Sequence, residues 1–334
     1  MLKTGQRILL FAFFPLTLAA QQTTPVQPAG FVAPVRGSFV ETANGSRLFH
    51  HALDDSCELV ISRNGGNPQN PGAALVLRDR HDQFLWSLEW MPANPYCDYI
   101  CITSTFTDET GNIYASGRFK GQVDLDPGQD VQFEKTAHPD ASDGFLIKLD
   151  ETGKFRWAKT FGGQNSAYAF CDLYCGAGTA DGNILFMGSY AWSVDFNPGN
   201  EEQVEFSGSA DPHPFILRLD TAGQLLDVHV VECSAIAGIN SYSIDEENNY
   251  YITYYFHDSI NLSLDKSAPL HFVSAHDYYN TCTAKYNSRF ELVWARHLEL
   301  DFNSPVISTK EQPFFPLAHA EIRKSQLVLH SSFF

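Results

Sequence analysis

Short apolar runs separated by turn-forming residues make up most of the chain. Between positions 143 and 213 these runs occupy 145–149, 155–161, 183–190, 193–196 and 203–206. Gly, Asn, Asp and Pro lie between the runs, a pattern typical of β-strands joined by tight turns. No segment carries an apolar stripe with the 3.6-residue period of a helix over a useful length, so the sequence predicts an all-β fold.

The runs recur with a period of about 70 residues, marked by two independent landmarks. The first is an apolar strand that ends in Asp or Asn, with a Trp position seven residues later. Trp86, Trp157 and Trp294 occupy that position, and Asp227 replaces the Trp in the third copy. The second landmark is a strand that starts at Gly-Asn or Asn-Asn, and it is found at 111–119, 182–190, 248–256 and, in a weaker form, 325–333. Because both landmarks recur with the same period, they indicate a true repeat.

A unit of about four strands repeated along the chain predicts a β-propeller, in which neighbouring sheets stack face to face. We divide the chain into a partial blade at 38–74, three blades at 75–142, 143–213 and 214–279, and a partial blade at 280–334. The two terminal pieces can combine into one blade and close a small ring of four or five blades. An incomplete larger ring and a set of independent β-sandwiches are the alternatives.

The landmarks, in this order, resemble the SBBP-type β-propeller repeats of secreted bacterial proteins. The resemblance is carried by Asp150, Gly153 and Trp157, and by the segment DETGNIYASGRFKGQVDLDPG at 108–128. It covers roughly residues 70–300 and fades towards the C-terminus. The resemblance implies a propeller fold and export, and it assigns no catalytic residues.

The first 20 residues have the form of a secretory signal peptide. Lys3 and Arg7 precede an apolar core at Ile8–Leu18. Ala19 and Ala20, which follow it, are small residues suited to cleavage by signal peptidase. Residues 21–37 are rich in Pro, Gln and Thr and read as a linker. The sequence therefore predicts a protein secreted to the periplasm, the cell surface or the medium.

The formal net charge of −17 at pH 7 argues against nucleic acid or an anionic membrane surface as a partner, because both attract basic proteins. After the N-terminal segment no uninterrupted apolar stretch is long enough for a membrane span, so membrane insertion is not expected.

Two equivalent acidic loops are candidates for a calcium site. They carry Asp124, Asp126 and Asp130 in one copy, and Asp195, Asn197 and Glu201 exactly in step 71 residues later. Oxygen ligands at alternate positions around a Pro-Gly bend suit Ca²⁺. The same residues also form ordinary Asx turns. The third copy at 261–267 has lost Pro, Gly and most carboxylates, so we favour a turn, retain calcium as the alternative and expect no other cofactor.

Seven cysteines in an exported chain include two pairs with the same spacing, Cys97 with Cys101 and Cys171 with Cys175. Positions i and i+4 of a straight strand lie about 13 Å apart, so a disulfide within a pair requires a turn between its cysteines. Disulfides, buried thiols and a zinc site all remain open.

Aromatic residues fall into a repeated set and a dense cluster. The repeated Trp position indicates packing between blades rather than stacking on carbohydrate. Tyr251, Tyr255 and Tyr278 belong to a cluster in which alternate members face opposite sides of a strand, so some are expected to be exposed and to bind carbohydrate or protein.

Sequence motifs of hydrolases, metalloproteases, P-loops and haem attachment are absent. A catalytic site assembled from loops of different blades would leave no local motif. We therefore predict a non-enzymatic binding or interaction scaffold outside the cell, with an unidentified protein or carbohydrate partner. The alternatives are a hydrolase or lyase with a site at the mouth of the propeller channel, and a truncated, non-functional remnant of a larger propeller.

Overall fold

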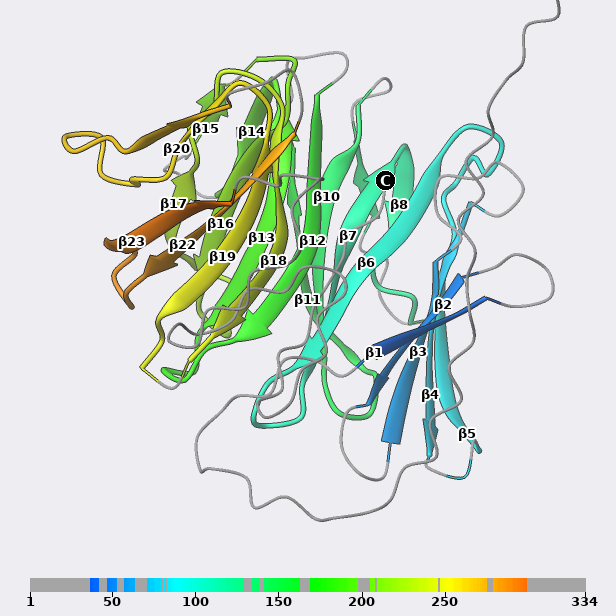
Figure 1. Ribbon diagram of the computed structural model, residues 1–334. Coiled ribbons are helices and arrows are strands. Elements are labelled where there is room, and N and C mark those ends of the chain that lie inside the picture. Colours follow the sequence, from blue (N-terminus) through cyan, green and yellow to red (C-terminus); the bar gives the residue numbers. More distant parts are fainter. Residues whose placement is uncertain are drawn as a thin grey trace, which may run out of the picture. The chain divides into compact units, whose positions relative to one another are not determined.

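The computed structural model describes residues 37–298, apart from 42–46, 53–56, 64–70, 80, 82, 129–133, 138–140, 163–168, 198–204, 208, 246 and 275–278. Within these residues every regular element is a β-strand (Figure 1). The signal peptide and linker predicted at 1–37 lie outside them except for Gly37, and so does the chain after Leu298.

Four large antiparallel sheets and three small ribbons account for the strands. The first sheet contains β1 (Gly37–Glu41), β2 (Arg47–Ala52), β3 (Cys57–Arg63), β4 (Ala73–Asp79) and β5 (Phe84–Trp90). The second contains β6 (Tyr99–Thr107), β7 (Ile113–Lys120), β10 (Asp143–Leu149) and β11 (Phe155–Phe161). The third contains β12 (Phe170–Gly178), β13 (Ile184–Ala191), β16 (His213–Leu219) and β17 (Leu225–Val230). The fourth contains β18 (Ala237–Ile244), β19 (Tyr250–Phe256), β22 (Asn280–Tyr286) and β23 (Leu292–Leu298).

A two-stranded ribbon is inserted between the second and third strands of the second, third and fourth sheets. The ribbons are β8 (Gln122–Asp124) with β9 (Glu134–Thr136), β14 (Ser193–Asp195) with β15 (Glu205–Ser207), and β20 (Ser259–Asn261) with β21 (His271–Val273). The first strand of each of these sheets also has a register shift at the equivalent place. The sequence repeat is therefore a repeat of structure.

The sheets divide the chain at different places from the sequence units. β4 and β5 open the unit at 75–142, but β4 pairs with β3 and β5 pairs with β4, so both strands complete the first sheet. In the same way β10 and β11 complete the sheet of β6 and β7. The period is shared, but hydrogen bonding between strands that are distant in sequence sets where each sheet begins.

Hydrophobic clusters join each sheet to the next. Leu75 and Trp90 of the first sheet are buried in one cluster with Ile100 and Phe145 of the second. Further clusters join the second sheet to the third and the third to the fourth. All eight residues of β13 are buried, as expected for a strand covered on both faces. The sheets thus share continuous cores at their boundaries.

Candidate functional site

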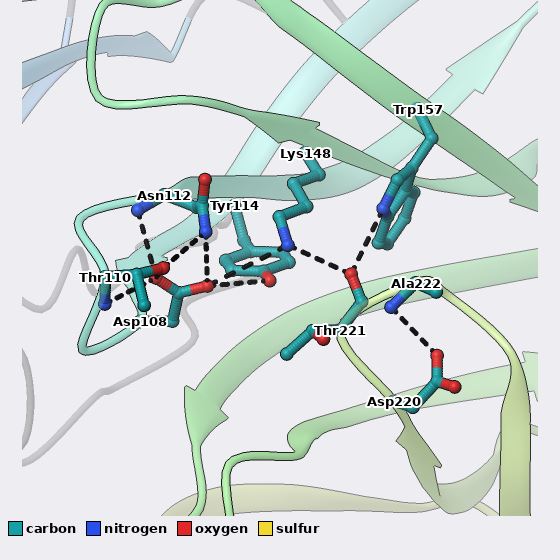
Figure 2. Close-up of polar contacts among 9 residues, drawn as sticks. All are labelled: Asp108, Thr110, Asn112, Tyr114, Lys148, Trp157, Asp220, Thr221 and Ala222. Atoms are coloured by element: carbon teal, nitrogen blue, oxygen red, sulfur yellow. Dashed lines mark hydrogen bonds and ion pairs between the residues drawn. The ribbon is translucent and has the colours of Figure 1, made fainter.

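Five side chains gather at one end of the second sheet (Figure 2). This Asp108 cluster consists of Asp108, Thr110, Asn112, Tyr114 and Lys148. Asp108 follows β6, and its Oδ1 accepts hydrogen bonds from the backbone N–H groups of Thr110 and Asn112, both at 3.0 Å. Its Oδ2 accepts from Asn112 Nδ2 at 2.8 Å and from the Tyr114 hydroxyl at 3.0 Å. The carboxylate therefore fixes the β6–β7 turn from inside.

Lys148 of β10 pairs with Tyr114 of β7, and this register places its amine beside the carboxylate. Lys148 Nζ lies 3.9 Å from Asp108 Oδ2 and 5.1 Å from the centroid of the Tyr114 ring. Burial alone would raise the pKa of Asp108, but hydrogen bonds from Asn112, Thr110 and Tyr114 outweigh it and the pKa lies below its usual value. Burial also lowers the pKa of Lys148, against the opposing effect of Asp108.

The cluster holds a turn of the third sheet. Lys148 Nζ donates to the carbonyl oxygen of Thr221 at 2.9 Å, and Trp157 Nε1 donates to the same oxygen at 3.3 Å (Figure 2). Thr221 lies in the β16–β17 turn, where Asp220 Oδ1 accepts from the backbone N–H of Ala222. A Cβ on Gly223 of this turn would lie only 3.1 Å from the Trp157 ring. Trp157 therefore packs between sheets, as the repeated Trp position predicts.

The same kind of contact joins the other sheets. The turn at Asp150–Gly153 of the second sheet packs on Trp86 of the first, where a Cβ on Gly153 would lie 2.9 Å from Cε2 of that ring. At the third boundary Arg218 NH1 donates to the carbonyl of Ser288 at 3.4 Å. At each of the three boundaries, the turn between the third and fourth strands of one sheet thus packs on the sheet that precedes it in the chain.

The acidic loops are Asx turns in the structure. Asp124 Oδ1 accepts from the N–H of Asp126 at 3.1 Å, and Asp126 Oδ1 accepts from the N–H of Gly128 at 2.9 Å. Asp195 Oδ1 accepts from the N–H of Asn197 at 2.9 Å. In the third copy Asn261 Oδ1 accepts from the N–H of Ser263 at 3.2 Å, as Asp124 does from Asp126, and Asp265 Oδ1 accepts from the N–H of Ser267 at 2.9 Å. The side chains of Asp124, Asp126 and Asp195, predicted as calcium ligands, therefore stabilise these turns.

The described residues do not include all six predicted calcium ligands. Asp130 and Glu201 lie outside the described residues. Among those it does describe, no group of three or more His, Cys, Asp or Glu side chains has the arrangement of a metal site. Calcium binding by the remaining loop residues stays a prediction.

The paired cysteines differ in their surroundings. Cys97 is exposed in the turn before β6, Cys101 is partly buried within β6, and Cys171 is fully buried in β12. The structure has all three as thiols, and the side chain of Cys175 lies outside what it describes. A register shift between Leu173 and Cys175 bends β12 within the second pair. Disulfide formation within either pair stays a prediction.

The structure describes two of the three tyrosines predicted as a binding surface, and their surroundings differ. The hydroxyl of Tyr251 in the fourth sheet donates to Asp245 Oδ2 at 3.2 Å, as the hydroxyl of Tyr114 does to Asp108 Oδ2 in the second. Tyr255 lies four residues further along β19, with its ring 5.9 Å from that of Tyr279. Tyr278 lies outside the described residues. Tyr279, which the sequence reasoning did not select, is 56% exposed and also contacts the His257 ring at 5.8 Å.

A cysteine–histidine contact was also missed. Cys233 Sγ lies 3.3 Å from His213 Nδ1, although the two residues are 20 positions apart in the sequence. The other ring nitrogen, His213 Nε2, accepts the backbone N–H of Ser209 at 3.3 Å. Burial raises the pKa of Cys233 to about 12 and lowers that of His213. This pair holds a neutral thiol and lacks the thiolate that a nucleophile requires.

Comparison with known proteins gives one informative similarity. The chain is 24% identical over 209 residues to an uncharacterized WD repeat-containing protein of Acanthamoeba polyphaga mimivirus. The alignment covers 56% of this chain and 15% of that relative, so the chain spans only a small part of its length. No protein-family model matches the chain.

The repeated antiparallel sheets and this similarity together fit a β-propeller-like, all-β repeat class. Across the part of the chain that the structure describes, no helix has the length and apolar character needed to cross a membrane.

Proposed function

We propose that the protein is an exported, non-enzymatic scaffold that binds a protein partner through an aromatic surface on its fourth sheet. The Tyr279 surface consists of Tyr255, His257 and Tyr279. The observation that carries the proposal is the exposure of Tyr279 beside two supporting rings, Tyr255 at 5.9 Å and His257 at 5.8 Å. Tyrosine is enriched in protein interfaces because it offers a large rigid contact area together with a hydroxyl group.

The surface is held by buried structure. Phe256, between Tyr255 and His257, is fully buried, and Tyr255 packs closely over Gly238 of β18. Burial raises the pKa of Tyr255 to about 12, so its hydroxyl stays protonated as a hydrogen-bond donor near neutral pH. A rigid frame lowers the entropy lost when a partner orders the surface.

The wider architecture is also part of the proposal. We take the SBBP-type resemblance and the signal-like N-terminus to support a secreted propeller whose sheets close into a small ring of four or five blades. Export follows from residues 1–20, which the structure leaves undescribed.

The test uses the chain from Gln21 onward, immobilised and exposed to the medium and cell-envelope proteins of the producing organism. Tyr279→Ala removes the exposed ring, and Tyr96→Ala is the matched control because Tyr96 is 88% exposed in the turn before β6. We expect at least one protein to be retained by the wild type and by Tyr96→Ala and lost by Tyr279→Ala, measured by quantitative mass spectrometry.

Two results oppose the proposal. Identical sets of retained proteins for all three chains would remove the Tyr279 surface as the binding site. Binding on a glycan array that depends on Tyr279, without any such protein, would replace the protein partner with a carbohydrate.

A further inference from the structure

Lysine and arginine side chains lie over aromatic rings at several places in the described residues. The distances from the cation to the ring centroid are 5.1 Å for Lys148 over Tyr114, 4.9 Å for Lys285 over Tyr251, 6.0 Å for Arg118 over Tyr99, 5.6 Å for Arg218 over Phe290, and 5.4 Å for Arg296 over Trp294. These contacts are favourable because the face of an aromatic ring is negative. The protein thus supplies many of its rings with a cation from its own chain.

One of these contacts recurs with the repeat. Tyr251 and Lys285 of the fourth sheet follow Tyr114 and Lys148 of the second by 137 residues. The lysine amine in both sheets also lies near a carboxylate, at 4.0 Å from Asp245 and 3.9 Å from Asp108. A cation held against a tyrosine ring is therefore a repeated element of these sheets.

Tyr279 has the ring without the cation. Its ring contacts Tyr255 and His257, and no lysine or arginine of the described residues lies over it. The residue is 56% exposed, whereas Tyr114 is fully buried beneath its lysine. The face of the Tyr279 ring can therefore receive a group from outside the chain.

Strand pairing gathers the three rings of the Tyr279 surface. β19 and β22 pair Phe256 with Asn280, and the same register brings His257 opposite Tyr279, with Tyr255 two residues earlier on the same side. The Tyr279 ring is inclined by 74° to that of Tyr255 and by 72° to that of His257. With rings turned so steeply against one another, a cation at this surface can contact more than one ring.

The supporting rings are fixed before any partner arrives. Tyr255 lies over Gly238, where a Cβ would come within 2.4 Å of its Cζ atom, so a glycine is required beneath it. The backbone N–H of His257 donates to the carbonyl oxygen of Ile236 at 2.9 Å. Little conformational entropy is then lost when a cation binds.

The charge of the chain favours a cationic partner. Asp and Glu outnumber Lys and Arg by 39 to 22, which gives the net charge of −17 at pH 7. Asp258, which directly follows His257, is exposed and adds a carboxylate to this end of the fourth sheet. A negative protein attracts basic segments and speeds their association.

We propose that the Tyr279 surface binds the side chain of a lysine or arginine in a basic segment of a partner protein, with the cation against the Tyr279 ring. The inference rests on the proposed function and names the chemistry of its partner. The partner's cation takes the place that Lys285 has over Tyr251.

Fluorination of the ring tests the contact directly. Position 279 of the full chain carries in turn phenylalanine and its 4-fluoro, 3,5-difluoro and 3,4,5-trifluoro derivatives. Fluorine withdraws electrons from the ring face and keeps the ring's shape and apolar character, so a cation contact weakens stepwise. The probe is a fluorescein-labelled peptide of alternating lysine and glycine, and its binding is measured by fluorescence anisotropy at physiological ionic strength.

We expect the affinity to fall by about 2- to 30-fold across the series. The same peptide with every lysine acetylated should bind much more weakly, because acetylation removes the charge. The matched control carries the same four residues at position 96, since Tyr96 is 88% exposed and no described ring contacts it. Fluorination there should leave the affinity unchanged, which separates the ring contact from attraction by the net charge.

Four results overturn the proposal. They are a lysine peptide that does not bind, an affinity that stays constant across the series at position 279, equal binding of the acetylated peptide, and binding to phosphatidylcholine vesicles that depends on Tyr279 in place of the peptide. The last result would assign the surface to a lipid headgroup.

The pull-down experiment with Tyr279→Ala distinguishes this failure from failure of the proposed function. A protein that is lost with Tyr279→Ala, beside an affinity that fluorination leaves unchanged, would keep the binding function and remove the cation contact. Loss of both results would remove both.

Discussion

Lys148 donates to the carbonyl oxygen of Thr221 across the boundary between two sheets, at 2.9 Å. The bond joins residues 73 positions apart, and Trp157 donates to the same oxygen. The second sheet therefore binds the backbone of the third, in addition to packing against its side chains. A backbone acceptor allows the side chain at the turn to vary without loss of the contact.

Loss of the Lys148 amine should weaken this boundary. Lys148→Met keeps most of the apolar stem and removes a charged donor, so we expect the free energy of unfolding to fall by about 1.5–3 kcal/mol. Urea denaturation monitored by circular dichroism measures the change. Lys266→Met is the control, because Lys266 is 82% exposed beside Glu232 and should change stability little. Equal effects of the two variants would contradict a structural role for the bond to Thr221.

Alanine variants at three glycines should distinguish the stability cost of backbone strain from the cost of a clash with a neighbouring sheet. Gly178 has open space around a Cβ and an ordinary φ, so Gly178→Ala should be close to neutral. Gly182 has equal space but a φ of +79°, so Gly182→Ala should cost about 1–2 kcal/mol. Gly153 combines a φ of +83° with a Cβ position 2.9 Å from the Trp86 ring, so Gly153→Ala should be the most destabilising. Thermal and urea unfolding of the three variants give the ranking, and any other order would contradict the packing of Trp86 on this turn.

Asp143 should make stability depend on pH. Its carboxylate lies at the start of β10, close to the Cys171 thiol, and burial raises its pKa from 3.8 to about 7. Between these values the folded chain binds more protons than the unfolded chain, so the free energy of unfolding should fall as the pH rises. The contribution of Asp143 to the free energy of unfolding is fully present below about pH 4 and is lost as the pH rises through about 7.

Asp143→Asn should flatten this dependence and give a more stable protein than the wild type at pH 8. Urea titrations at pH 5 and pH 8 measure both effects. The carboxyls of Asp108, Asp150 and Asp181 have lowered pKa values and act in the opposite direction, at lower pH. An equal fall between pH 5 and 8 in the variant would assign the dependence to another group.

Thiol reactivity should follow burial. Cys97 is exposed, whereas Cys171 and Cys282 are buried and burial raises their pKa values. We expect iodoacetamide to label Cys97 in the native protein and the two buried thiols only after unfolding, as measured by mass spectrometry of peptides. Protection of Cys97 that is removed by a reductant would instead show a disulfide, with Cys101 as the nearest candidate in sequence.

Calcium should have little effect on stability if the acidic loops act as turns. The bonds from Asp124 and Asp195 to backbone N–H groups already use one oxygen of each carboxylate. We expect the melting temperature to be the same in excess EDTA and in millimolar CaCl₂. A rise with CaCl₂ that Asp124→Asn abolishes would establish a calcium site at the first loop.

Local pattern predicted individual strands well and long-range arrangement less well. The runs at 155–161 and 193–196 correspond to β11 and β14 because apolar runs between strong turn residues decide a strand locally. β12 was missed because its sequence, FCDLYCGAG, mixes small and polar residues without clear alternation. The place where each sheet begins depends on pairing between strands that are far apart in the sequence, such as β7 with β10, and no local pattern records it.

The binding candidates show the same limit. Tyr251 and Tyr255 share a strand, yet one supports a turn and the other supports the Tyr279 surface. The decisive partner of Lys148 lies 73 residues away, so its role could not be read from its own strand. One signal was available: the constant spacing of Asp, Asn, Tyr, Lys and Trp between the second and fourth sheets indicates that these residues act as a group.

At the boundary between the third and fourth sheets, the large aromatic ring belongs to the turn. At the boundary between the second and third sheets, it belongs to the preceding sheet. Asp227 stands where the second sheet has Trp157, and Phe290 stands on the turn where Gly223 would be expected, with a φ of +58° and its ring 5.6 Å from the Arg218 guanidinium. A Phe-bearing turn placed against Trp157 would collide with it, and a glycine turn placed against Asp227 would leave a hole. A module exchanged across this boundary would consequently mismatch unless both halves of the boundary moved together, so the fourth sheet is matched specifically to the third.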